Sequence, residues 1–314
     1  MTDNTLQQTI KTLKSYQNYR LIERYEQPLY YCLDDGSQKF RGVFLDVEAT
    51  GLYMATDQII ELGWVVFEYG ADGRIFKILD VGSEYQDPGK DIPAEIVALT
   101  GINDAMVKGC RINKQKLFQR LSEADIVIAH HAGFDRPFIE TLWEDSPQTP
   151  WACSMTQIPW KQEAIESPKL EYLAYRFGFF YEGHRASTDC LAGVHLLSKT
   201  LPLSKEQVLK VLLQNSAKKT FRVWAVNAPI EQKDILKARQ YRWSPAGEGK
   251  HKAWFIELEA DRLLSEITFL QTLYAYPICL PVEELNAKNR FSRKTTTAEH
   301  WIGKPSDIEL ILSK

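Results

Sequence analysis

The 314-residue chain has no apolar run that approaches the roughly 18 residues needed by a membrane-spanning helix. Its first residues, Met1 to Lys11, are polar and lack the apolar core of a secretory signal peptide. We therefore expect a cytoplasmic protein with no membrane partner. Hydrophobic residues make up 44% of the chain and charged residues 25%. These shares are ordinary for a globular protein and indicate neither a disordered chain nor a fibre.

Cysteine is scarce, and its spacing suggests no pairing. The five cysteines are odd in number, lie far apart and include no CxxC pair, so neither a disulfide framework nor a structural zinc site is expected. We expect reduced thiols that are mostly buried, because free cysteine behaves as a small hydrophobic residue. The five are Cys32, Cys110, Cys153, Cys190 and Cys279.

The net charge of −3 is unevenly distributed along the chain. Residues 201–314 carry 18 Lys and Arg against 13 Asp and Glu, whereas residues 1–200 carry 20 against 28. A basic C-terminal part fits a nucleic-acid surface, and it equally fits an ordinary solvated face. The length suits one domain of about 150–200 residues and a smaller one.

Hydrophobic patterns divide the chain into three parts. Residues 1–40 begin with a helical pattern that ends near Gln27-Pro28, and we interpret them as an N-terminal helical extension packed on the main domain. Residues 41–200 predict an α/β domain with a mixed sheet flanked by helices, because three strands precede alternating helices and strands. Residues 200–204 form the expected boundary. Residues 205–314 predict a small α+β module, in which residues 286–297 are basic, polar and expected to be mobile.

Individual elements follow from periodicity and turn residues. The predicted strands are 41–48, 59–69, 74–81, 125–129, 221–226 and 253–258. The predicted helices are 92–99, 104–108, 114–122, 136–143, 170–177, 188–198 and 230–239. A Gly-Ala-Asp-Gly turn at 70–73 joins the second and third strands into a hairpin.

Two carboxylates stand at the end of the first apolar strand. Asp46 and Glu48 are two residues apart, so their side chains share one face of the sheet. Carboxylates held close together repel unless a cation neutralises them, and oxygen ligands suit Mg²⁺ or Mn²⁺. Alone, this pair fits a metal site less well than an exposed strand end.

Two further motifs contain histidine and aspartate at strand or loop ends. Residues 130–135 read His-His-Ala-Gly-Phe-Asp and follow an apolar strand, and Asp135 would ordinarily be a helix cap there. Residues 184–189 read His-Arg-Ala-Ser-Thr-Asp and precede an apolar helix, whose first turn Asp189 would stabilise. Taken singly, each motif favours these structural roles.

Together, the motifs D-x-E, H-x-A-x-F-D and H-x-x-x-x-D occur in the order of the DEDDh exonucleases, and residues 41–200 resemble that DnaQ-like family. The segments Gln58 to Gly63 and Ile92 to Ile102 also look like the family's intervening elements. The resemblance implies a ribonuclease-H-like fold and a 3′→5′ exonuclease that hydrolyses phosphodiesters with two divalent ions.

The resemblance also implies a role for each motif residue. Asp46, Glu48 and Asp189 would hold one metal, and Asp46 and Asp135 the other. His184 would be the general base, because imidazole titrates near neutral pH. The expected substrate-binding residues are Thr50, Gly51, Leu52, His130, His131 and Phe134. The family often has Asn where this chain has His131, which leaves the substrate contact at that position open.

The C-terminal module combines basic and aromatic residues. Such a mixture can bind single strands through charge and stacking, although its tryptophans also suit a small core. The candidate phosphate contacts are Lys233, Lys237, Arg239 and Arg242.

We therefore predict a 3′→5′ exonuclease that releases nucleoside monophosphates from single-stranded nucleic acid, with DNA favoured over RNA. An exoribonuclease or oligonucleotide hydrolase with the same site, a polymerase-associated proofreading subunit and a non-catalytic binding protein are the alternatives. The five filled motif positions argue against the last. The oligomeric state stays open, a homodimer included.

Overall fold

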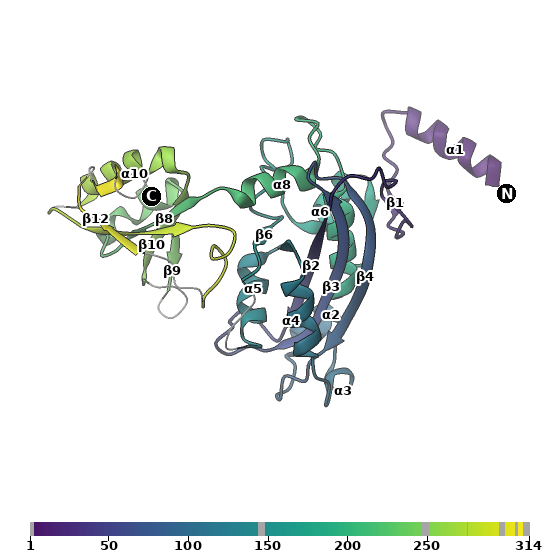
Figure 1. The fold of residues 1–314 in the computed structure, drawn as a ribbon, viewed down its shortest axis with the longest axis horizontal. Coiled ribbons are helices and arrows are strands. Elements are labelled where there is room, and N and C mark those ends of the chain that lie inside the picture. The colour runs from purple at the N-terminus through teal and green to yellow at the C-terminus, as the bar shows by residue number, and fades with distance from the viewer. Residues whose placement is uncertain are drawn as a thin grey trace. The chain divides into compact units, whose positions relative to one another are not determined.

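The computed structural model describes residues 3–143, 148–245, 251–274, 276–294, 299–304 and 307–309. The chain forms two compact units, Met1–Ser216 and Ala217–Lys314, each with its own five-stranded sheet (Figure 1). The mixed α/β class and the small α+β module predicted from the sequence are confirmed.

The domain boundary expected at residues 200–204 is wrong. Helix α8 (Val208–Ala217) follows that segment, and its side chains Val208, Leu209 and Leu212 are fully buried in the core of the first unit. The intervening loop is also anchored, because the Glu163 carboxylate accepts hydrogen bonds from the amides of Leu203 and Ser204. The proline and the weak periodicity that suggested a linker mark a loop within the first unit.

The sheet of the first unit has the strand order β4-β3-β2-β5-β6. Neighbours β2, β3 and β4 are antiparallel, whereas β5 is parallel to both β2 and β6. The hairpin turn is as predicted, with Gly73 in the left-handed region at φ 82°. The strands are β2 (Lys39–Ala49), β3 (Ile59–Gly70), β4 (Ile75–Tyr85), β5 (Ile126–Ala129) and β6 (Trp151–Cys153).

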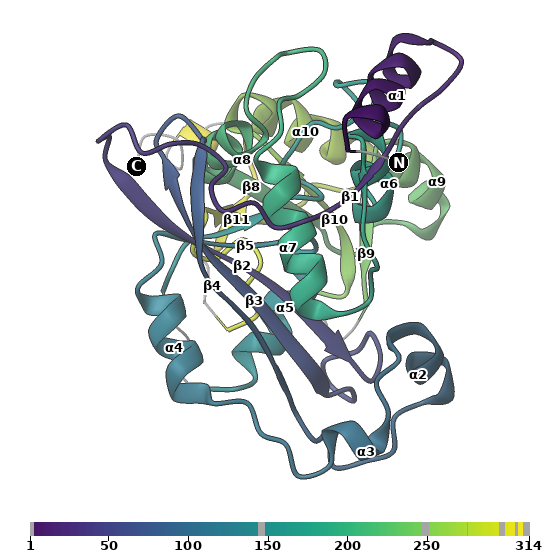
Figure 2. The ribbon, with the colours of Figure 1, turned by 90° about the vertical axis from the view of Figure 1, so that its right-hand side faces the viewer.

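Helices cover both sides of this sheet, as in ribonuclease-H-like folds. Helix α7 packs on β2 and β3 (Figure 2), whereas α4 and α5 lie on the other side (Figure 1). Gly193 permits the close approach of α7, because a Cβ atom there would lie 2.2 Å from the Phe44 ring. The helices are α2 (Ala94–Thr100), α3 (Asp104–Val107), α4 (Lys114–Ser122), α5 (Ala132–Glu140), α6 (Leu170–Arg176) and α7 (Ala186–Leu197).

The N-terminal extension contains the expected helix, α1 (Asp3–Ser15). Helix α1 itself does not pack on the main domain as predicted, because the Leu6 side chain is 50% exposed. The following segment does pack on the domain. Strand β1 (Glu23–Arg24) pairs with β7 (Phe179–Phe180), and the Tyr25 ring lies 4.7 Å from the His195 ring of α7.

The second unit has the element order β-α-β-β-α-β with one further strand. Its antiparallel sheet has the order β12-β11-β8-β10-β9, and β8 to β11 form the split βαβ arrangement of ferredoxin-like folds. The elements are β8 (Thr220–Ala225), η1 (Ile230–Gln232), α9 (Lys233–Ala238), β9 (Arg242–Ser244), β10 (Ala253–Leu258), α10 (Ala260–Leu273), β11 (Leu280–Leu285) and β12 (Glu299–Ile302).

Helix α10 covers one face of this second sheet. Leu263, Ile267 and Leu270 pack with strand residues such as Val223 and Ile256 into a separate hydrophobic core. The mobility expected for residues 286–297 is wrong at Arg290, which is 5% exposed and donates a hydrogen bond to the Lys218 carbonyl. Residues 295–297 lie outside the described residues.

All five cysteines are free, as expected, but they are not mostly buried. Only Cys153 and Cys190 are buried, and Cys279 is exposed in the loop before β11. Among the described residues, no helix is long and apolar enough to cross a membrane.

Candidate active site

Strand β2 places two carboxylates on the face of the sheet that α7 covers. Phe44, Asp46 and Glu48 alternate with the buried residues Leu45 and Val47, so all three point to one side. The shared face predicted from the sequence is confirmed. Glu48 lies directly opposite Glu61 of β3 in the strand register.

Helix α7 brings the third carboxylate to the same place. Asp189 and Gly193 are four residues apart and therefore lie on one side of the helix. Because Gly193 contacts Phe44, Asp189 lies over the part of β2 that carries Asp46. The Asp189 carboxylate accepts hydrogen bonds from the Tyr181 hydroxyl at 2.9 Å and from the Arg185 amide at 3.1 Å.

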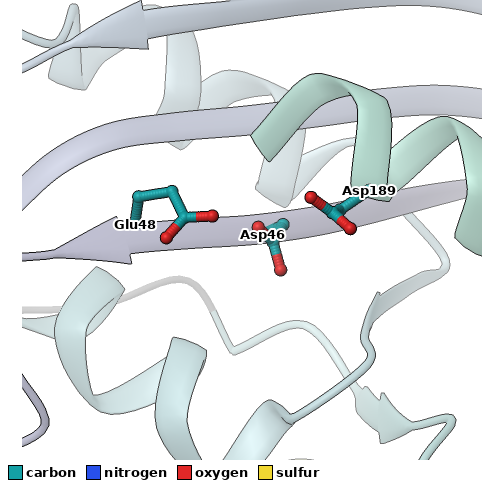
Figure 3. Close-up of side chains that lie close together, drawn as sticks. All are labelled: Asp46, Glu48 and Asp189. Carbon is teal, nitrogen blue, oxygen red and sulfur yellow. The ribbon is translucent and has the colours of Figure 1, made fainter. Parts of the chain in front are cut away.

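The resulting cluster can hold a metal ion. One carboxylate oxygen from each of Asp46, Glu48 and Asp189 lies within 4.8 Å of the other two. Figure 3 shows the Asp46 side chain between those of Glu48 and Asp189, with two carboxylates coming from β2 and one from α7. Hard oxygen ligands in such a group suit Mg²⁺ or Mn²⁺.

Asp135 approaches from α5. Strand β5 pairs with β2 only as far as Leu45, which leaves the Val47 amide without a partner in β5. This amide donates instead to Asp135 Oδ1 at 3.1 Å. The other oxygen, Oδ2, is buried and has no hydrogen-bond partner among the described residues. A buried carboxylate oxygen without a donor is costly unless a cation binds it, so this residue also fits a metal ligand.

Burial and mutual repulsion make the four carboxyl groups hard to ionise. Burial, followed by the charges of Asp135 and Asp189, raises the pKa of Asp46 well above its ordinary value. Burial also raises the pKa of Asp135 and of Asp189, and it raises the pKa of Glu48 to about 7. A divalent cation would reverse this effect by favouring the charged forms.

A buried ion pair supports the cluster and was not identified from the sequence. The fully buried Glu61 carboxylate accepts hydrogen bonds from the Arg185 guanidinium and the Ala186 amide, each at 3.2 Å. The Arg185 guanidinium also donates to the Tyr85 hydroxyl at 2.6 Å. The positive charge of Arg185 thus offsets the negative charge of Glu61, which lies opposite Glu48. The same interaction holds the start of α7 in place.

Gly63 opens the space for this contact. A Cβ atom at Gly63 would lie 2.3 Å from the Ala186 carbonyl carbon, so a side chain there would push α7 away from β3. The segment Gln58 to Gly63, which contains Glu61 and Gly63, already resembled an element of the DEDDh family in the sequence. Arg185 and Ala186 lie within the motif at residues 184–189, but nothing in that motif indicated that they pair with Glu61.

His184 lies on the loop that leads into α7. Its side chain is 49% exposed, and its Nε2 atom lies 3.5 Å from a Glu171 oxygen. Its backbone is left-handed, with φ at 65°, which is uncommon for a residue other than glycine. The proximity of His184 contributes to lowering the pKa of Asp189, although burial has the larger, opposite effect.

The residues expected to receive the terminal nucleotide divide into two groups. Thr50 is buried, its amide donates to the Gln58 carbonyl, and its hydroxyl bonds to Asp57 Oδ1. Its amide is therefore not available to a substrate. Gly51 is half-buried, and Leu52, 77% exposed, is available for an apolar contact.

The second motif divides in the same way. His130 is buried, and its two ring nitrogens bond to Ser154 Oγ and the Pro168 carbonyl, so its expected substrate contact is wrong. Burial lowers its pKa to about 4, which keeps the ring neutral near pH 7. His131 is exposed and stacks on Phe134 at 6.1 Å. These two rings remain candidates for contact with a base.

Two of the four residues of the predicted basic patch on the second unit pair with carboxylates. Arg239 donates two hydrogen bonds to the fully buried Glu266 carboxylate, and Arg242 lies 3.5 Å from Glu257. Lys237 lies over the Trp254 ring. Lys233 and Lys237 are exposed, and no carboxylate of the described residues pairs with either, so both remain phosphate candidates.

A ribonuclease-H-like sheet with acidic side chains converging from β2, α5 and α7 defines a class of enzymes that act on phosphodiesters with divalent metals. Comparison with known proteins agrees. The family model for exonucleases, RNase_T, matches residues 43–197. The first unit therefore contains a domain of the DEDDh exonuclease family.

The curated relatives include polymerases. The chain is 33% identical over 168 residues to the PolC-type DNA polymerase III of Listeria monocytogenes, covering 51% of this chain. It is 28% identical over 173 residues to the Bacillus subtilis protein of the same name, covering 52% of this chain. The matches span only 11% and 12% of those proteins.

The matches among solved structures include two exonuclease complexes. Exonuclease X with 5′ overhanging duplex DNA has a TM-score of 0.40 and 21% identity, covering 55% of this chain and 99% of that one. Escherichia coli Exonuclease I with a dA16 oligonucleotide has a TM-score of 0.44 and 14% identity, covering 75% and 68%.

The electrostatics of the site predict how pH affects the metal-free protein. A carboxyl group whose pKa is raised by folding binds more protons in the folded state, so stability falls as pH rises. For Glu48 the pH window lies between its ordinary pKa of 4.5 and its raised pKa of about 7. Across this window the free energy of unfolding should fall by on the order of 3 kcal/mol. We expect the unfolding free energy in EDTA, measured against Glu48→Gln, to fall across this window and to recover with Mn²⁺. A difference that stays constant or rises with pH would contradict the electrostatic description.

Proposed function

We propose that the chain is a 3′→5′ exonuclease that releases nucleoside monophosphates from single strands, with DNA favoured over RNA. The observation that carries the proposal is the convergence of Asp46, Glu48, Asp135 and Asp189 in a domain of the exonuclease family, with His184 beside Asp189. The resemblance of the three motifs to the DEDDh family supports the polarity.

Two divalent ions, Mg²⁺ or Mn²⁺, fit the carboxylates. Asp46, Glu48 and Asp189 would hold one ion, and Asp46 and Asp135 the other, because Asp135 Oδ2 is a buried oxygen to which no described residue donates a hydrogen bond. The ions would neutralise the phosphate and make a water nucleophilic near neutral pH. The carboxylates position the ions, and the buried ion pair of Glu61 and Arg185 holds α7 against β3.

The other residues act on the substrate and on protons. His184 removes a proton from the attacking water. Its imidazole lies on the loop before α7 and is half exposed to solvent. Leu52 contacts the terminal base or sugar through its exposed side chain. The His131 and Phe134 rings stack against a neighbouring base. No residue of this group reports a preference for the 2′-hydroxyl, so the DNA preference needs a direct test.

The test of polarity uses matched DNA and RNA oligonucleotides with Mg²⁺ or Mn²⁺. A 5′-labelled strand should give a descending ladder, and a 3′-labelled strand should lose its label at the first step. DNA should be degraded faster than RNA of the same sequence. Internal cuts in a circular single strand would refute the exonuclease assignment, and faster loss of RNA would assign the alternative, an exoribonuclease.

The PolC-type relatives make proofreading beside a polymerase a second candidate function. A proofreading enzyme removes a mismatched 3′ terminus from duplex DNA faster than a matched one, because the mismatched end frays. A stand-alone single-strand enzyme should degrade unpaired strands faster than either duplex. Comparing the three substrates at equal concentration separates these two candidates.

A further inference from the structure

The second unit contains a cavity at one end of its sheet. It has a volume of about 450 Å³ and is lined by residues that include Asn227, His251, Lys252, Tyr276, Cys279 and Trp301. Antiparallel pairing explains the position, because the end of β8 lies beside the starts of β10 and β11. The volume lies within the range of small-molecule sites in proteins.

Two exposed aromatic rings line this cavity. Trp301 on β12 is 54% exposed, and Tyr276 before β11 is 59% exposed. The Trp301 ring meets the His251 ring edge to face at 6.2 Å, and His251 packs in turn on the buried Trp224. Tyr276 meets the buried ring of Tyr274 at 6.2 Å. The buried Tyr274 ring therefore supports Tyr276, and the buried Trp224 ring supports Trp301 through the half-buried His251.

The charged groups around the cavity favour an anionic ligand. The His251 ring forms a hydrogen bond with the Glu299 carboxylate at 2.9 Å, so that carboxylate already has a partner. Lys252 is exposed, and within the described part of the chain its ammonium has no ion-pair partner. The exposed carboxamide of Asn227 likewise makes no hydrogen bond there. None of the described residues that line the cavity carries a carboxylate that could pair with a cationic ligand.

We propose that this cavity binds one nucleotide of a single-stranded nucleic acid, with the base against the Trp301 and Tyr276 rings and the phosphate at Lys252. Stacking on aromatic side chains and contact with a basic residue are the two interactions by which single strands are bound without sequence preference. The choice of a nucleic acid as ligand rests on the proposed function. The cavity lies in the second unit, so it is separate from the carboxylate cluster on β2 and α7.

The proposal replaces the basic patch expected from the sequence. Arg239 and Arg242 are engaged by Glu266 and Glu257, whereas Lys252 is not engaged by a described residue. A single strand should therefore be held at the β12 side of the second sheet, where Trp301 lies.

The test measures binding of a fluorescent dT oligonucleotide of about 16 nucleotides. This length is at the upper end of the site sizes of small single-strand-binding domains. The full-length chain carries Asp46→Asn and is kept in EDTA, so that no cleavage occurs. Trp301→Ala should weaken binding about 5- to 150-fold, the range reported by alanine substitution at stacking positions. Trp301→Phe should restore most of the affinity.

Trp243→Ala is the matched control, because Trp243 is 47% exposed and lies on β9, the opposite edge strand of the same sheet. It should leave the affinity unchanged. Lys252→Gln should reduce the salt dependence of binding by about one counterion, whereas Lys218→Gln should not, because the Lys218 ammonium already pairs with Glu259. Thermal unfolding of each variant checks that the second unit still folds.

Cys279 supplies a direct reporter of occupancy. Its thiol is exposed at the cavity, so a saturating oligonucleotide should slow its alkylation, read by peptide mass spectrometry. The half-buried Cys32 and Cys110 of the first unit serve as internal references. Equal affinities for Trp301→Ala and its parent would overturn the proposal, as would an equal loss in Trp243→Ala. Cleavage of a dinucleotide by the wild-type chain tests the proposed function separately.

Discussion

Asp46→Asn is expected to lower the rate of single-strand cleavage by at least about 10³-fold, because metal ions supply several kcal/mol of transition-state stabilisation. Asp46 is the residue that both proposed metal positions share, and it lies between Glu48 and Asp189 (Figure 3). Asparagine keeps the shape of the side chain but removes the charge that binds the cations. The measurement is single-turnover cleavage of a 5′-labelled strand at saturating Mg²⁺.

The same substitution should have the opposite effect on stability. Burial and the charges of Asp135 and Asp189 raise the pKa of Asp46, so a neutral amide relieves repulsion in the metal-free protein. We expect Asp46→Asn to unfold at a higher temperature than wild type in EDTA and to gain less from added Mn²⁺. Lost activity with raised metal-free stability separates a metal ligand from a residue needed for folding.

Glu68→Gln provides the control for this experiment. Glu68 lies on β3 of the same sheet, near the end opposite to Glu61, and pairs with Lys77 at 3.4 Å. Its removal should change cleavage and metal response little, since exposed ion pairs contribute about 0–1 kcal/mol. Retention of more than a tenth of the wild-type rate by Asp46→Asn would contradict the metal-site assignment.

Local sequence patterns predicted those parts of the fold that depend on local chemistry. The apolar alternation of β2, the hairpin turn ending at Gly73 and the bounds of α4 all agree with the structure. The N-terminus of α4 carries a clear signal, because the Asn113 side chain caps the helix at Lys116. Strand β6 was missed, because its three residues are too few to show a period.

The end of the first domain was placed too early for a related reason. Helix α8 continues this domain and buries its apolar side against a core formed by strands far away in the sequence. The residue pattern of α8 alone does not indicate which unit's hydrophobic core it packs on. A loop containing proline looked like a linker, whereas Glu163, about forty residues earlier, holds it in place.

The candidate site shows the same division between local and distant information. The resemblance of the three motifs to the DEDDh family predicted the carboxylates, and the strand period placed Asp46 and Glu48 on one face. It did not predict that Arg185 pairs with Glu61, 124 positions away, or that Tyr181 donates to Asp189. It also assigned His130 to the substrate, although both of its ring nitrogens are used within the domain.

His184→Asn is expected to lower kcat by about 10²- to 10⁴-fold, the usual contribution of a general base. Asparagine is the informative replacement because His184 has a φ of 65°. Asparagine adopts this left-handed conformation more readily than other residues with a side chain. Alanine would add backbone strain of roughly 1 kcal/mol or more at the start of α7, and would mix a structural effect with the chemical one.

Two further measurements assign the loss to proton removal. Stabilisation of His184→Asn by Mn²⁺ should match that of wild type, because the variant keeps the four carboxylates proposed to hold the metal ions, Asp46, Glu48, Asp135 and Asp189. The acidic limb of the pH–rate profile should flatten in the variant, since the group that must lose its proton is gone. Glu171→Gln is the control, because it removes the carboxylate 3.5 Å from the imidazole and leaves the base in place. Wild-type turnover by His184→Asn at saturating Mg²⁺ would make His184 an ordinary loop residue and remove the base from the mechanism.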